Sequence, residues 1–164
     1  MANDMVPLAT ITLSAAAQTV TFSSINQSYK DLIVVGSFSV PNTSVQVWYN
    51  NDSAATLYAR VGYYASGLSV KVDGFNTNTG GTANRSIIGS GSSGGTGFYR
   101  SHIMDYSATD KYKTSTGNYV RAVEVSTEVR YWASTSSITS VSFYCQGSPF
   151  FDIGSTFSLY GVKG

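Results

Sequence analysis

Few residues of this chain could carry chemistry, and they lie far apart in the sequence. The chain has one histidine, His102, and one cysteine, Cys145. Nucleophilic catalysis needs a base held beside the nucleophile, and no serine here stands in a nucleophile-elbow sequence. We therefore expect a structural or surface role for His102. Cys145 follows Val141 and Phe143 at alternate positions, which predicts a small buried hydrophobic residue.

Carboxylates could act in pairs, as in glycoside hydrolysis. The two glutamates, Glu124 and Glu128, share one predicted strand. They would stand about 13 Å apart at about 3.3 Å per residue, which is beyond either hydrolytic geometry. We expect them to form a solvated strand face together with Arg130. The opposite face of that strand is apolar and comprises Val123, Val125, Val129, Tyr131 and Ala133.

Metal and cofactor sites have little support either. A single cysteine excludes a Cys-based zinc site and an intramolecular disulfide. Residues 50–52, Asn-Asn-Asp, lack the acidic density of a calcium loop and favour an Asx-rich turn. Residues 89–94 match the dinucleotide fingerprint G-x-G-x-x-G, but that motif needs a following helix, and a β-like run follows here. We expect a protein without enzymatic activity, cofactor or metal.

The fingerprint-like match belongs to a longer glycine-rich segment. Residues 74–97 hold eight of the sixteen glycines, with Asn, Ser and Thr between them, and only residues 86–88 could form a strand. Segments of this length without secondary structure are usually functional or disordered loops. We expect a long mobile loop at residues 74–97.

Outside that segment, apolar and polar residues alternate with period two almost from end to end, as in half-buried strands. The pattern predicts an all-β, antiparallel sandwich with about eight to ten strands and little helix. Residues 1–7 would form an N-terminal arm, and residues 8–164 a single domain. The expected strands cover residues 11–13, 20–22, 31–40, 45–49, 58–64, 68–72, 98–106, 119–133, 138–145 and 156–162.

The composition restricts the possible partners. Charged residues make up 12% of the 164, and the formal net charge is +1. Because there is no polybasic stripe, nucleic acid is not an expected partner. No stretch approaches the roughly 18 apolar residues of a membrane span, and no basic, apolar N-terminal signal is present. The 26 serines and 17 threonines instead predict a neutral surface, which is less costly to bury against another molecule than a charged one.

Tyrosine is abundant, with 12 residues, and several lie on predicted strands beside loops. Amphipathic rings of this kind pack equally well against sugars and against another protein subunit. The residues that we expect to contact partners are Met5, Val6, Trp48, Tyr58, Tyr63, Tyr99 and Tyr112.

Three stretches together resemble a family of short β-rich structural proteins of tailed bacteriophages. The stretches are residues 20–25 with 29–34, residues 47–52 with Tyr58, and residues 138–143 with Phe151 and residues 154–162. The C-terminal stretch, Gly-Ser-Thr-Phe-Ser-Leu-Tyr-Gly-Val, is the most specific of the three. Residues 66–118 do not take part in the resemblance.

The resemblance implies a jelly-roll-like sandwich that acts as a non-enzymatic part of a virion, assembled in the host cytoplasm. The expected role is that of a capsid decoration or cement protein, which binds the major capsid protein and copies of itself, as a homotrimer. The alternative is a tail-fibre or tail-tip domain that binds a host surface glycan. The chain shows no fibrous repeat, coiled-coil heptad or second domain, which favours the decoration protein.

Overall fold

Two antiparallel β-sheets make up the part of the chain that the computed structural model describes, namely residues 4–40, 44–53, 57–66, 69–76, 87–88, 95–121, 124–146 and 150–164. The larger sheet has the strand order β1-β12-β3-β8-β9-β10-β5-β6, and the smaller has the order β2-β11-β4-β7. The strands are β1 (Met5–Thr12), β2 (Thr19–Phe22), β3 (Asp31–Val40), β4 (Val45–Tyr49), β5 (Tyr58–Ser66), β6 (Ser69–Asn76), β7 (Ile87–Ile88), β8 (Gly95–Met104), β9 (Lys113–Arg121), β10 (Glu124–Trp132), β11 (Val141–Cys145) and β12 (Thr156–Val162).

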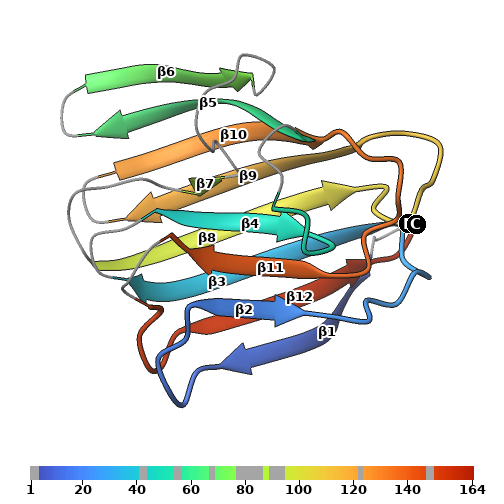
Figure 1. Ribbon diagram of the computed structural model, residues 1–164, viewed down its shortest axis with the longest axis horizontal. Helices are drawn as coiled ribbons and strands as arrows, with labels where there is room; N and C mark the ends of the chain where they lie inside the picture. The colour runs from blue at the N-terminus through green and yellow to red at the C-terminus, as the bar shows by residue number, and fades with distance from the viewer. Residues whose placement is uncertain are drawn as a thin grey trace.

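The smaller sheet lies against one face of the larger sheet (Figure 1). Every strand pair is antiparallel. Among the described residues there is no α-helix, and so none that is long and apolar enough to cross a membrane. The predicted all-β antiparallel sandwich is confirmed.

The first strand starts earlier than predicted. β1 begins at Met5, which pairs with Val162 at the end of β12, so residues 5–7 belong to the sheet and not to a free arm. Pro7 lacks the N–H that a central strand needs, but β1 is an edge strand, and its register shifts between Pro7 and Ala9. The alternation of apolar residues is weak on such an edge, which is why the sequence placed the boundary too late.

The alternation predicted one strand over residues 119–133, but the structure has the end of β9 and the whole of β10 there. β9 ends at Arg121, which pairs with Glu124 at the start of β10, and the ladder continues to the pair of Lys113 with Trp132. No glycine, proline or asparagine marks the connection in the sequence, so the alternation passes through it without a turn signal. The described residues therefore hold twelve strands, more than the eight to ten expected.

The predicted loop at residues 74–97 is described only in part. β6 extends to Asn76, residues 87–88 pair with β4 as the predicted short strand, and β8 begins at Gly95. The remaining residues, including the fingerprint-like 89–94, lie outside the described part of the chain.

An aromatic cluster joins the two sheets. Phe157 of β12 lies 4.9 Å from Phe143 of β11 and 5.0 Å from Phe151, measured between ring centroids. Phe38 of β3 stacks on Phe157 at 5.7 Å. All four rings are fully buried, so this cluster fixes the smaller sheet over β3 and β12.

We predict that Phe157→Ala lowers the free energy of unfolding by about 3–5 kcal/mol, because it leaves a cavity among rings that cannot collapse into it. Phe150→Ala is the matched control, since Phe150 is 41% exposed and lies outside this cluster. The control should cost about 0.5 kcal/mol. Urea unfolding followed by circular dichroism measures both, and equal losses would contradict the assignment of the core.

Candidate interaction surface

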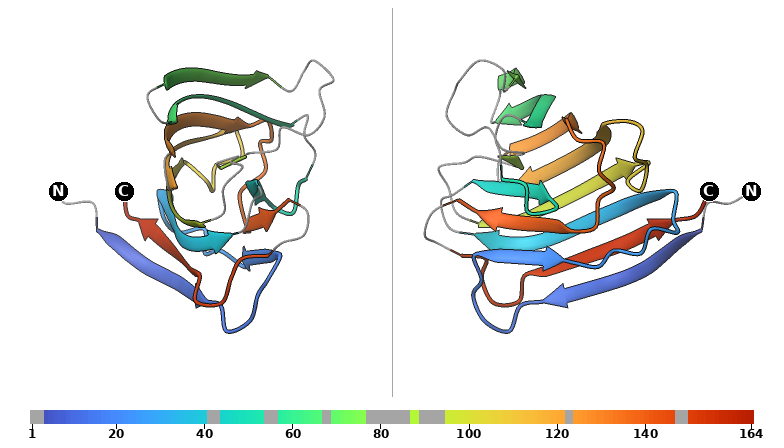
Figure 2. Two further views of the ribbon diagram at one scale, coloured as in Figure 1. Left: turned by 90° about the vertical axis from the view of Figure 1, so that its left-hand side faces the viewer. Right: turned by 45° about the vertical axis from the view of Figure 1, so that its right-hand side comes forward.

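The larger sheet has one covered face and one open face. Alternate residues of β8, β9 and β10 are buried beneath the smaller sheet, among them Tyr99, Ser115 and Trp132. The residues between them point to the opposite side, over which no further layer of the described chain lies (Figure 2). We call this side the outer face.

Apolar residues on the outer face stand in register across five strands. Phe98 of β8 lies opposite Val120, and Val120 lies opposite Val125. Val125 in turn lies opposite Ala65, and Ala65 opposite Val70 of the edge strand β6. Neighbours in such a row are close enough for their side chains to form one continuous surface.

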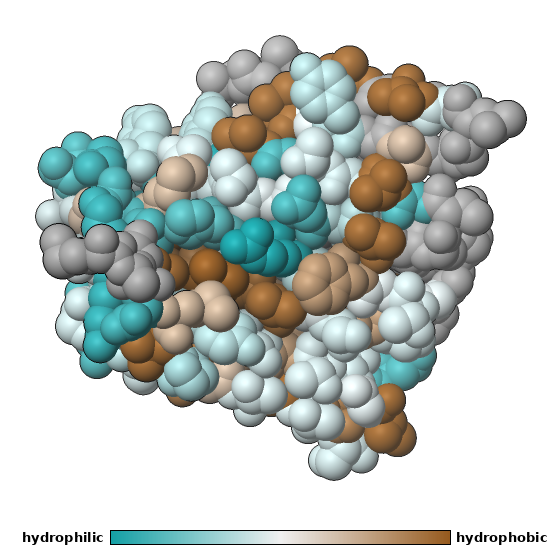
Figure 3. All heavy atoms as spheres, turned by 180° about the vertical axis from the view of Figure 1, so that it is seen from behind, coloured by the Kyte–Doolittle hydropathy of each residue, from teal (hydrophilic) through white to brown (hydrophobic). Residues whose placement is uncertain are grey.

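Further exposed apolar residues on the same strands enlarge this row to a patch. We call it the outer apolar face, and its nine members, each between 39% and 76% exposed, are Val61, Tyr63, Val70, Val72, Phe98, Val120, Val125, Val129 and Tyr131. Figure 3 views the open side and shows hydrophobic side chains along its margin and its upper part. Large contiguous apolar patches on a soluble domain usually mark an interaction site.

Two of the residues predicted to contact partners lie on or beside the outer apolar face. Tyr63 belongs to it and is 58% exposed. Tyr112, equally exposed, stacks on Tyr131 with ring centroids 6.4 Å apart and ring planes 12° from parallel. The other eight members of the face were not predicted.

Tyr58 and Tyr99 were also predicted to contact partners, but both are buried and cannot do so. The Tyr58 hydroxyl accepts a hydrogen bond from the Tyr49 backbone N–H at 3.0 Å and donates one to the Asp52 carbonyl at 2.9 Å. Tyr99 is buried in the core, where its ring lies beside Gly117: a Cβ atom at that glycine would be 3.4 Å from Tyr99 Cε2. Burial raises the pKa of both hydroxyls above the usual value, so both remain neutral.

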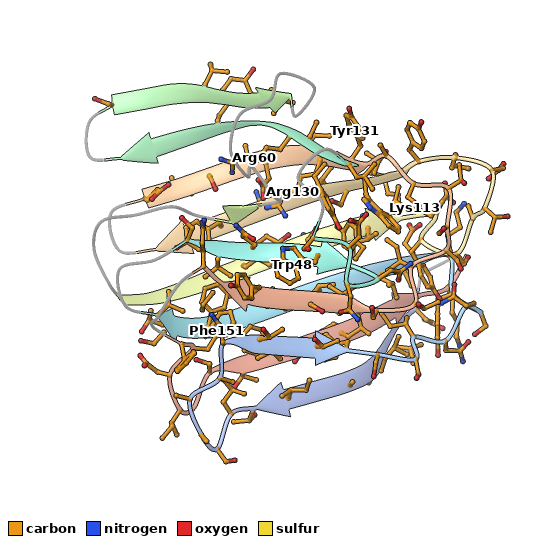
Figure 4. The ribbon with its side chains drawn as sticks, in the orientation of Figure 1. Trp48, Arg60, Lys113, Arg130, Tyr131 and Phe151 are labelled. Atoms are coloured by element: carbon orange, nitrogen blue, oxygen red, sulfur yellow. The ribbon has the colours of Figure 1, made fainter. Side chains whose placement is uncertain are left out.

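The remaining predicted contacts lie elsewhere. Met5 is exposed and Val6 is half-buried on β1, at the opposite edge of the larger sheet from β6. Trp48 lies on the outside of the smaller sheet, where its ring stacks on Tyr144 at 4.4 Å (Figure 4). The seven predicted residues therefore do not form one site.

Glu128 and Arg130 on the polar face of β10 are buried, which is the reverse of the prediction, whereas Glu124 at the start of the strand is half-exposed. The Glu128 and Arg130 side chains are only 4% and 3% exposed, and they form an ion pair with each other. Arg60 of β5 approaches the same carboxylate, with 3.5 Å between Nη1 and Oε2 (Figure 4). Arg130 also donates a hydrogen bond from Nη1 to the Tyr99 hydroxyl at 3.2 Å. Since Glu128 faces the interior, Val125 and Val129 face solvent.

Glycines on both neighbouring strands make room for Glu128. Its partners in the ladder are Gly117 on β9 and Gly62 on β5. A Cβ atom at Gly62 would lie 2.7 Å from the Thr127 carbonyl oxygen, and one at Gly117 would lie 3.3 Å from Glu128 Oε1. Glycine at these two positions thus leaves room for the charged Glu128 side chain inside the core.

The buried charges stabilise one another. Burial opposes the charge of Arg130, but the Glu128 carboxylate together with Tyr99 and Tyr49 outweighs this and holds the pKa of the guanidinium above its usual value. Burial also disfavours the charged form of Tyr49 and so raises its pKa. The Tyr49 hydroxyl donates a hydrogen bond to Ser115 Oγ at 3.3 Å. The Glu128 carboxylate and both Nη atoms of Arg130 are engaged by protein partners, so the cluster is part of the fold.

The histidine and the cysteine have structural surroundings, as expected. His102 Nε2 lies 2.9 Å from Asp31 Oδ2, and the other oxygen of Asp31 accepts the Asp105 backbone N–H at 2.8 Å. Asp105 has a positive φ of 47°, so the Asp31 carboxylate holds the turn after β8. Burial raises the pKa of Cys145 to about 12, which leaves the thiol protonated and unreactive.

The Asx-rich turn at residues 50–52 is engaged in protein contacts. Asn50 Oδ1 accepts backbone N–H groups of Thr139 at 2.8 Å and Ser140 at 3.1 Å. Asp52 accepts the Trp132 indole N–H at 2.7 Å. Among the described residues, no group of three or more His, Cys, Asp or Glu side chains could hold a metal ion.

Comparison with known proteins adds little. No family model matches the sequence, and no curated protein matches it significantly. Among solved structures, the chain is similar to a marine PL-14 alginate lyase from Aplysia kurodai, with 9% identity and a TM-score of 0.28. That likeness covers 84% of this chain and 70% of the lyase, and at this TM-score it indicates neither a shared fold nor a shared activity.

We predict that Glu128→Gln lowers the free energy of unfolding by about 3–5 kcal/mol, because it leaves Arg130 buried without a counter-charge. Glu124→Gln is the matched control, on the half-exposed start of the same strand, and should cost less than about 1 kcal/mol. Chemical denaturation of both variants measures the difference. A loss at Glu128 no larger than that at Glu124 would show that the ion pair does not stabilise the fold.

Proposed function

We propose that this protein is a non-enzymatic structural component of a bacteriophage particle, a decoration or cement protein that binds the capsid lattice. The observation that carries the proposal is the outer apolar face, which lies in register across β8, β9, β10, β5 and β6. A soluble chain keeps such a face when another protein buries it. The resemblance of the sequence to small virion proteins supplies the kind of assembly.

The chemistry of the face supports a structural role. Burying apolar surface contributes roughly 25 cal/mol for each Å² removed from water, without the directional demands of hydrogen bonds. Neighbouring positions on the face are neutral, such as Thr116, Asn118 and Thr127, so few charges would lose their hydration on binding. A cement protein needs such a surface, because it must add many weakly polar contacts across a repeating lattice.

The particle itself provides the test. In virions purified from the phage that encodes the chain, the protein should sediment with the particles, and specific antibodies should label the shell. Shells without the protein should break at a lower temperature, and adding it back should restore their stability. Particles that lack the protein altogether would contradict the proposal, and label confined to the tail would favour the second candidate below.

The second candidate is glycan binding by a tail-fibre or tail-tip protein, and the surroundings of Trp48 favour it. The indole N–H donates to Gln46 Oε1 at 3.1 Å, and the Gln18 amide donates to the Tyr144 hydroxyl at 3.5 Å. Stacked aromatic rings with neutral amides around them can hold a sugar ring by its apolar face and its hydroxyls.

We predict that, if this second function operates, Trp48→Ala removes binding on an array of neutral and acidic glycans. Phe98→Ala serves as the control, since Phe98 is an exposed aromatic residue on the opposite side of the molecule. Glycan binding by the unaltered chain that persists in the Trp48 variant would exclude this surface. The absence of any glycan signal from the unaltered chain would remove the second candidate.

A further inference from the structure

The outer apolar face is large enough for a stable interface. Nine Val, Phe and Tyr side chains at 39–76% exposure present roughly 800 Å², the area that each partner contributes to an interface of standard size. Tyr112 continues the patch through its stack on Tyr131. An area of this size is more than the isolated exposed residues of an ordinary surface provide.

The charge on this face is compatible with its own copy. Among the side chains described on the outer face between β8 and β6, the titratable ones besides the neutral tyrosines are Arg100 and His102, and His102 is paired with Asp31. A two-fold interface places identical groups on both sides, so it requires that like charges stay apart. A neutral face of valine, threonine and tyrosine brings few like charges together, so it can bind its own copy without complementary charges on the partner.

The position of Arg100 fixes where such an axis can lie. The face spans β8, β9, β10, β5 and β6, so its central strand is β10 and its central row contains Thr127, between Asn118 and Tyr63. Arg100 stands in the same row two strands away, because it pairs with Asn118. A two-fold axis that runs along β10 over Thr127, at about 4.8 Å per strand, places the two Arg100 residues about 20 Å apart, whereas an axis along the row would bring them together. That separation exceeds the screening length of about 8 Å at physiological salt.

We propose that the outer apolar face binds the same face of a second copy of this chain, with the two-fold axis running along β10 near Thr127. The two larger sheets then stack face to face, as sheets do in a sandwich core, with side chains of one interdigitating with those of the other. This inference rests on the proposed function in one respect only, namely that the face is buried in an assembly. It names a second copy, and not the capsid protein, as the molecule that buries this face, so contacts with the capsid lattice would fall to other surfaces of the pair. It replaces the expected homotrimer with a two-fold pair.

Sedimentation equilibrium of the full chain over a range of concentrations tests the proposal. The unaltered chain should form dimers, and Val120→Lys with Val125→Lys should weaken the association at least about 30-fold, as expected for residues at the centre of an interface. Thr10→Lys with Thr12→Lys is the matched control, since both threonines are exposed on β1 at the far edge of the same sheet. A monomer, or a dimer equally stable in both double variants, overturns the proposal.

Two more variants keep the test informative if lysine disturbs the fold. Val120→Thr with Val125→Thr keeps the side-chain shape and the strand preference, and should still weaken the dimer. Thr127→Cys should give a covalent dimer on mild oxidation, because a residue on a two-fold axis meets its own copy, whereas Thr10→Cys should not. The buried Cys145 does not interfere. Equal cross-linking at both positions contradicts the two-fold axis.

The proposed function and this inference can fail separately. If the chain is monomeric but the paired lysines at positions 120 and 125 abolish its binding to particles, the face serves the lattice, and the self-association is wrong. If the chain forms the dimer but is absent from particles, the self-association stands and the virion role is wrong.

Discussion

The structure depends on a mismatch between its two sheets, one of eight strands and one of four. A four-stranded sheet cannot cover both the width and the two faces of an eight-stranded one. The rings of Phe143 and Phe157 hold the smaller sheet over the β3 and β12 side, where the interior is apolar. Toward β10 and β5 the interior becomes polar, and Tyr49 of β4 contacts Trp132 and Tyr58 there. The arrangement of polar and apolar surface on the whole molecule follows from this.

The Glu128 row illustrates how the mismatch is accommodated. Across the larger sheet, one inner row runs from Leu159 through Val34 and Ser101 to Gly117, Glu128 and Gly62. The side chains become smaller from Leu159 to Gly117, and the charged Glu128 then follows between two glycines. A buried ion pair costs desolvation and needs close partners, and the flanking glycines allow Arg60 and Arg130 to provide them. Ion pairs therefore stabilise the part of the interior that the aromatic cluster does not reach.

The sequence predicted the positions of the strands better than it predicted which face of each strand is buried. Alternation along β10 separated Val125 and Val129 from Glu128 and Arg130 correctly, because side chains of a strand point alternately to opposite faces. It could not determine which set is buried, since that depends on what packs against the strand. Polarity suggested that Glu128 faces solvent, and the partners on β5 and β8 that reverse this are distant in sequence. The same limit explains why Tyr58 and Tyr99 were placed on the surface, whereas Tyr63, a tyrosine of the same strand as Tyr58, is exposed.

The reversal of β10 also changes the meaning of the low charge of the chain. If the charged residues of β10 lay outside, they would keep the larger sheet soluble and deter contact with other proteins. With Glu128 and Arg130 inside, a chain that has few charges uses two of them where water does not reach. The outer face is then left with valines, tyrosines, neutral hydroxyls and Arg100. Evolution could have placed lysines at these exposed strand positions at little cost in stability, as protein surfaces commonly do. The valines at positions 61, 120, 125 and 129 agree with our proposal that another protein chain buries this face.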